Sequence, residues 1–201
     1  MQGMGNATIG RPRGFDADEA LERAMHVFWE HGYEGACLTA LTDAMGINKT
    51  SLYAAFGNKE QLFLKVLDRY ADGPAGYAQR ALEEPTARAV VEALLRGAAE
   101  TTTRPDSPAG CLGVQAALPA SDGNRCAHEA LVEWRNTAAV RLEERFRRAV
   151  DEGDLPADAD PHELATYVST VAQGIAVQAA NGLDRDALQR IVDTTLRQWA
   201  P

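Results

Sequence analysis

Apolar residues recur at helical spacing along almost the whole chain from residue 16 onward. The first example begins at Asp16, a candidate N-cap, and runs through Leu21, Met25 and Phe28 to Gly32, where a glycine predicts the helix end. No stretch alternates apolar and polar residues for long enough to predict a sheet. An aromatic content of only 6% also argues against a β-rich core. The sequence therefore predicts an all-α fold.

The same spacing, together with capping residues, predicts the remaining helices. We expect Thr39 to cap a short second helix that Gly46 ends, a third helix over 49–56, and a fourth capped by Asn58. Further helices are expected at 77–83, 86–103, 111–118, 127–152, 161–182 and 185–199. The prediction is thus nine or ten helices without an internal repeat at a fixed period.

The segment Gly73-Pro74-Ala75-Gly76 interrupts the helical pattern and suggests a domain boundary. We divide the chain into an N-terminal arm (1–13), a first domain (14–73) and a second domain (74–201). Two interpretations of 73–76 remain open, because the segment can be a hinge that lets the fourth helix swing or a rigid spacer.

Two short helices joined by the turn Gly46-Ile47-Asn48 predict a helix-turn-helix, whose second helix enters a DNA major groove. Lysine, threonine and serine can contact base edges or phosphates, and tyrosine commonly reaches a phosphate. The outward-facing residues near the start of the second helix are of these types: Lys49, Thr50, Ser51 and Tyr53. The alternative is that they form only a solvated helix surface.

The segment GINKTSLYAAFGNKEQLF, residues 46–63, strongly resembles the DNA-binding domain of the TetR family. The resemblance continues upstream through Ala24, Phe28, Gly32-Tyr33 and Thr39, and it covers roughly residues 14–70. It implies phosphate contacts for Thr39, Tyr53 and Lys59, and base contacts for Lys49, Thr50 and Ser51. Asn48, which we group with these DNA-binding residues, stands where the family often has Ser or Thr.

The resemblance also implies the function, a homodimeric transcriptional repressor that binds a palindromic double-stranded DNA operator and is released by a small-molecule effector. It implies a C-terminal helical bundle that binds the effector and forms the dimer. An activating role, or a helical ligand-binding or protein-interaction module without operator binding, remains as an alternative. The acidic balance of the chain gives this alternative some weight.

The net charge of −9 is unusual for a DNA-binding protein, because phosphate neutralisation supplies much of the affinity. Residues 1–73 alone carry a net charge of −3. Local geometry must therefore bring the few cations to the DNA. Arg11 and Arg13 are candidates for a minor-groove arm, although an ordinary disordered terminus explains them equally well.

Residues 164–183 contain no charged side chain. A membrane helix is a poor explanation, because the segment holds several polar residues and has no second segment like it. Burial between the domain and a partner chain is the better one. We expect the helices at 161–182 and 185–199 of two protomers to form a four-helix dimer interface.

Effector contacts are sought among residues that add polar or aromatic character to otherwise apolar helices. These candidates are Cys111, Gln115, Trp134, Tyr167 and Gln173. The alternative for each is an ordinary place in the core or in the interface.

Other functional classes lack their residues in this sequence. The four histidines have no metal-ligand spacing, and no phosphate loop, dinucleotide loop or nucleophile elbow is present. We therefore expect no enzymatic activity, no metal and no cofactor. The three cysteines do not suggest a disulfide framework, and the N-terminal residues do not resemble a secretory signal, so we expect a cytoplasmic protein.

Overall fold

The computed structural model describes residues 15–118 and 121–199, and every regular element in these ranges is an α-helix. In chain order the helices are α1 (Ala17–Gly35), α2 (Leu38–Met45), α3 (Lys49–Phe56), α4 (Lys59–Asp72), α5 (Gly76–Ala81), α6 (Ala87–Thr101), α7 (Leu112–Gln115), α8 (Arg125–Asp151), α9 (Pro161–Ala180) and α10 (Arg185–Gln198). The all-α prediction is confirmed. The proposed arm residues Arg11 and Arg13 lie outside the described residues.

Helix α1 begins where it was predicted and bends where it was expected to end. Asp16 caps it, because its Oδ1 accepts hydrogen bonds from the backbone N–H groups of Asp18 and Glu19. Gly32 has φ 68° and ψ 176°, which breaks the regular helix before one further turn reaches Gly35. The predicted end at Gly32 is therefore a kink within α1.

Two further predictions, the cap of α2 and the extent of α7, are wrong, while α5, α6, α8, α9 and α10 begin and end within two residues of their predicted ranges. The N-cap of α2 is Cys37 and not Thr39: Cys37 has extended backbone and its Sγ accepts from the N–H of Ala40, so Thr39 falls in the first turn. Helix α7 is confined to Leu112–Gln115 instead of 111–118. The carbonyl of Ala116 instead accepts a hydrogen bond from the N–H of Tyr33 in α1, with an N···O distance of 2.8 Å.

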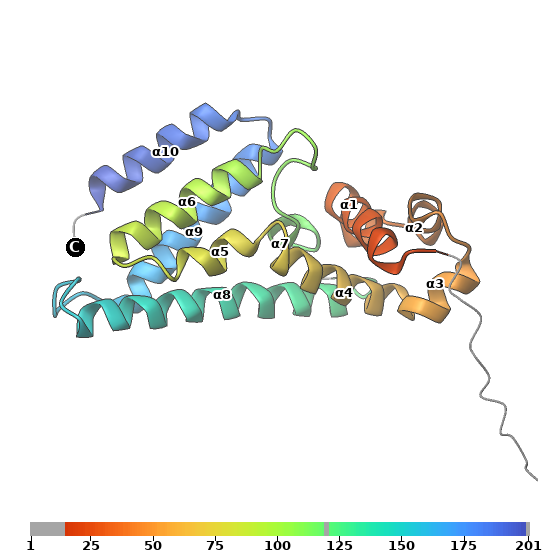
Figure 1. Cartoon of the computed structure of the whole chain (residues 1–201), viewed down its shortest axis with the longest axis horizontal. Coiled ribbons are helices and arrows are strands. Elements are labelled where there is room, and N and C mark those ends of the chain that lie inside the picture. The colour runs from red at the N-terminus through yellow and green to blue at the C-terminus, as the bar shows by residue number, and fades with distance from the viewer. Residues whose placement is uncertain (1–14, 119–120, 200–201) are drawn as a thin grey trace, which may run out of the picture.

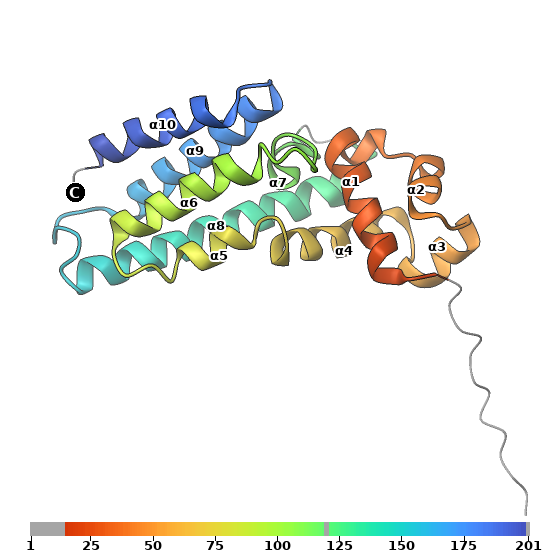
Figure 2. The ribbon, with the colours of Figure 1, turned by 45° about the horizontal axis from the view of Figure 1, so that its top comes forward.

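The helices form an elongated molecule with α1, α2 and α3 gathered at one end and α10 on the outer edge of the other (Figure 1). Helix α8 runs along much of its length, and the view in Figure 2 shows the same arrangement. Two hydrophobic clusters form the core. One joins α1–α4 to α7 and the first half of α8, and the other joins α6, α9 and α10 to the second half of α8.

Helix α9, which carries no charged side chain after Glu163, packs mainly on α8 and α6 of its own chain. Among the described residues, no helix combines the length and the apolar character that a membrane span requires.

Candidate nucleic-acid interface and ligand cavity

Helices α2 and α3 form the predicted helix-turn-helix at the end of the molecule (Figure 1). Gly46 ends α2 in the left-handed conformation, with φ 67°. Asn48 then starts α3, because its Oδ1 accepts a hydrogen bond from the N–H of Ser51 at 2.8 Å. The turn therefore fixes α3 through backbone geometry and one side-chain cap.

The two faces of α3 differ sharply in exposure. Leu52 and Phe56 are 0% and 6% exposed and anchor the helix in the first hydrophobic cluster. Tyr53, between them in the sequence, is 49% exposed, and Lys49 and Thr50 are also exposed. Ser51 is half-buried. The structure therefore presents the predicted contact residues of α3 on an open face, as contact with a nucleic acid requires.

Lys59, the first residue of α4, is held against an aromatic cluster. Its Nζ lies 4.4 Å from the ring centroid of Tyr33, a cation–π contact. The Tyr33 ring in turn packs against Phe28 and Phe63, with centroid distances of 6.0 and 5.2 Å. Burial lowers the pKa of Lys59, while the neighbouring Cys37 and Glu34 oppose this shift. The contact with Tyr33 therefore fixes the position of the Lys59 side chain in the free protein.

Tyr33 was not among the predicted site residues, although the sequence places it next to the kink at Gly32. Burial raises its pKa to about 12, so the ring stays neutral and keeps its cation–π contact at neutral pH. Thr39 is exposed in the first turn of α2.

The N-terminus of α4 is capped from both sides. Asn58 Oδ1 accepts from the N–H of Gln61, and Gln61 Oε1 accepts from the N–H of Asn58. Two predicted features, the Asn58 cap and the start of the fourth helix at Lys59, are therefore confirmed. The cation of Lys59 lies at a helix end whose dipole also favours an anion.

Substitutions of Asn48 test its role as the cap of α3 in the free protein, where no contact with DNA contributes. We expect Asn48→Ala to lower the free energy of unfolding by about 1 kcal/mol, because the N–H of Ser51 loses its acceptor. Asn48→Asp keeps a capping oxygen and should stay close to the parent. Chemical unfolding of both variants measures the difference. Equal losses for alanine and aspartate would contradict a capping role.

A cavity of about 420 Å³ lies among α4, α5, α6, α7, α8 and α9. Three of the five predicted ligand residues, Cys111, Trp134 and Gln173, line it. The other two do not. The side chain of Gln115 donates to the carbonyl of Ala109, and Tyr167 is 45% exposed on α9.

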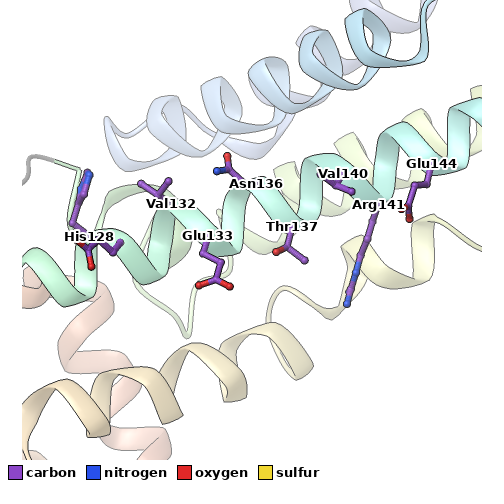
Figure 3. Close-up of a pocket in the computed structure, with 9 residues that line it drawn as sticks. His128, Val132, Glu133, Asn136, Thr137, Val140, Arg141 and Glu144 are labelled. Atoms are coloured by element: carbon purple, nitrogen blue, oxygen red, sulfur yellow. The ribbon is translucent and has the colours of Figure 1, made fainter.

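The polar groups of the cavity include several that were not predicted, among them Tyr77, Arg135 and Arg141. In the sequence, the charged residues of α8 resemble an ordinary solvated helix face. Nothing in the sequence therefore indicated that Arg135 and Arg141 line a cavity. Figure 3 shows Arg141 reaching from α8 toward α5, where its Nη1 donates to Oε1 of Gln79 at 2.9 Å. The same view shows a groove whose lining, among the residues that the structure describes, comes from α8 alone.

The thiol of Cys111 is buried and accepts a hydrogen bond from Oη of Tyr70, with an O···S distance of 3.1 Å. Burial raises the pKa of Cys111, and it also raises the pKa values of Tyr70 and Tyr77. The thiol is therefore protonated at neutral pH, which makes it a polar part of the cavity wall. Within residues 15–118 and 121–199, no group of three His, Cys, Asp or Glu side chains is placed to hold a metal ion.

Two family models match the chain. Residues 20–66 match the model described as bacterial regulatory proteins of the tetR family, and residues 87–195 match the tetracyclin repressor-like C-terminal domain. The HTH-type transcriptional repressor ComR of Escherichia coli (strain K12) is 34% identical over 94% of this chain and 91% of its own length. The transcriptional repressor AcnR of Corynebacterium glutamicum is 30% identical, with 87% of each chain covered.

A solved structure of a TetR family regulator also matches this chain. It contains a cysteine mutant of the TetR family transcriptional regulator CifR with a 26-bp double-stranded operator DNA. That chain is 45% identical to this one, the TM-score is 0.90, and the match covers 94% of this chain and 100% of that chain.

Proposed function

Because this chain belongs to the TetR family of transcriptional regulators, we propose that it is a ligand-responsive repressor. As a homodimer it binds a palindromic DNA operator, and a small-molecule effector releases it. The observation that carries this proposal is the open face of α3, where exposed Tyr53 adjoins the buried anchor Leu52. The resemblance of the whole chain to operator-binding relatives supports it.

We assign the DNA contacts by position on this face. Lys49, Thr50 and Ser51, at the start of α3, contact base edges in the major groove. Tyr53 and Lys59 contact phosphates, and so does Thr39. Asn48 acts first as the cap of α3.

The dimer forms through α9 and α10. The exposed face of α9 carries Tyr167, Gly174 and Val177, and Ile191 is exposed on α10. This face carries no charge after Glu163, and an exposed helix face with apolar side chains is typical of an isologous interface. The dimer holds the two copies of α3 at operator half-sites about one DNA turn apart, roughly 34–36 Å.

The effector occupies the cavity lined by Cys111, Trp134 and Gln173. Ala71, Asp72 and Ala75, at the end of α4 and in the following turn, line the same cavity. A ligand that favours a different position of α4 therefore changes the spacing of the two α3 helices. In this mechanism residues 73–76 act as the hinge.

These roles divide the chain into an arm (1–13), a DNA-binding domain (14–73) and an effector-binding and dimerisation domain (74–201). The family is one of regulatory DNA-binding proteins, and we propose no catalytic activity for this member. We propose a cytoplasmic location for the protein, because the operator DNA that it binds lies there.

Operator binding across a salt series tests the proposal, with the operator selected from a library of random duplexes. We expect Tyr53→Ala and Lys59→Ala to weaken specific binding by about tenfold each while folding is retained. The Lys59 variant should also reduce the slope of log affinity against log salt by about 1, because one phosphate contact is lost.

Lys65→Ala is the matched control, because Lys65 is an exposed lysine of α4 outside the proposed contacts. Parental affinity for the Tyr53 and Lys59 variants would overturn the site assignment. Failure to select any duplex would favour a helical ligand-binding or protein-interaction module instead.

A further inference from the structure

The effector cavity contains a cation without an acidic partner. Arg135, on α8, lines the cavity and is partly buried, and its Nη1 donates to the carbonyl of Gly113 at 2.8 Å. Among the described residues, no carboxylate forms a salt bridge with its guanidinium. Burial lowers the pKa of Arg135. A guanidinium in this position has hydrogen-bond donors to spare for a ligand.

The other charged groups of the lining leave this cation uncompensated. Among the described residues, Asp72 and Arg141 are the only charged lining residues besides Arg135, and Arg141 already donates to Gln79. Asp72 is exposed and, within the described residues, forms no salt bridge with Arg135. The lining therefore carries one more positive than negative charge.

The rest of the wall suits an apolar molecular body. Val114, Leu94 and Leu142 provide apolar surface, and the indole of Trp134 provides an aromatic one. The ring of Trp134 lies so close to the backbone of Gly113 that a Cβ there would approach ring atoms to 2.4 Å. A cavity of about 420 Å³ falls within the usual range for small organic ligands, roughly 300–1,000 Å³.

We propose that the effector is a small organic monocarboxylate, with its carboxylate paired to Arg135 and its apolar body against Trp134. A planar guanidinium fits a carboxylate with two parallel hydrogen bonds, and low-dielectric surroundings strengthen the pair. This inference rests on the proposed function, because it takes the cavity to be the effector site.

The same arginine connects the ligand to the DNA-binding end. Arg135 donates a hydrogen bond to the carbonyl of Gly113 in α7. Just after α7, the carbonyl of Ala116 accepts a hydrogen bond from the N–H of Tyr33 in α1. The ring of Tyr33 supports Lys59. A carboxylate that binds the free donors of Arg135 and shifts its guanidinium therefore also shifts the hydrogen bond to Gly113 and, through α7, the position of a proposed phosphate contact.

Binding of a matched pair of probes tests the ligand class. We use 4-phenylbutyrate and its neutral amide, 4-phenylbutanamide, and measure both by isothermal titration calorimetry with the full-length protein. We expect the carboxylate to bind at least about tenfold more tightly than the amide. Arg135→Gln should remove this preference, and Arg135→Lys should keep part of it because the charge remains.

Arg104→Gln is the control, because Arg104 is an exposed arginine outside the cavity lining. It should keep the full preference for the carboxylate. Three results would each overturn the inference: equal affinities for the two probes in the parent protein, no binding of either probe, or a preference that survives Arg135→Gln. If Arg135→Gln does not fold, the comparison of the probes in the parent protein decides alone.

Operator binding without any probe keeps this test separate from that of the proposed function. A protein that binds its operator but prefers no carboxylate retains the repressor function and loses the proposed ligand class. A protein that binds carboxylates through Arg135 but no operator retains the ligand site and loses the repressor function.

Discussion

Gly32→Ala is expected to lower the free energy of unfolding by about 3 kcal/mol. At φ 68° and ψ 176°, Gly32 occupies a backbone region that is essentially restricted to glycine, and forcing another residue into it costs about 1–3 kcal/mol. A Cβ at this position would also lie 3.0 Å from the carbonyl oxygen of Ala116. That oxygen accepts a hydrogen bond from the N–H of Tyr33. A shift of Ala116 that relieves the clash therefore weakens the hydrogen bond between α1 and the end of α7.

Gly153→Ala provides the matched control for this effect. Gly153 also has a positive φ, 76°, but no heavy atom lies within 4 Å of a Cβ built there. Its replacement should cost only about 1 kcal/mol, the typical penalty of the left-handed region. Urea unfolding at a fixed protein concentration, followed by circular dichroism, measures both variants. Equal losses would contradict an added cost from the backbone conformation of Gly32 and its contact with Ala116.

Val177→Glu is expected to raise the dissociation constant of the dimer by about 100-fold or more. Val177 lies on the exposed face of α9 that we assign to the interface. A two-fold interface receives the substitution twice, and an unpaired buried carboxylate typically costs several kcal/mol. Operator affinity at nanomolar protein should fall with it, because a monomer contacts only one half-site.

Val140→Glu makes the same change on α8, where Val140 is 52% exposed and lies outside the proposed interface. This variant should remain dimeric. Analytical ultracentrifugation measures both dissociation constants. A dimeric Val177→Glu protein would move the interface away from α9.

The helices were predictable from sequence to the extent that their signals are local. Asp16 and Asn58 are N-caps in the structure, as their residue types and positions predicted. The cap of α2 was missed because cysteine is not a usual capping residue, and the suitable Thr39 stands two positions later. The short length of α7 could not be predicted, because it depends on a contact with α1, more than 80 residues earlier in the chain.

The residues of the candidate sites were likewise predictable where their position depends on the local sequence, and not where it depends on contacts between distant segments. Lys49, Thr50 and Tyr53 occupy one short helix, so a local pattern was sufficient to place them on its open face. The cavity combines residues from six helices. Trp134 was a candidate because of its aromatic character, whereas Arg135 next to it looked like one more of the many charged residues of α8. Only the packing of α7 against α8 brings that guanidinium into an apolar wall.

The contact between α1 and the end of α7 limits how this regulator can be rebuilt. The first hydrophobic cluster includes Leu112, Ala127 and Leu131 as well as the helices that carry the DNA contacts. A chimera that joins residues 14–73 to the sensor domain of another regulator would expose the apolar surface that these side chains now cover. A working sensor exchange must therefore retain the stretch from about residue 111 to 131, so the useful junctions lie inside the C-terminal region.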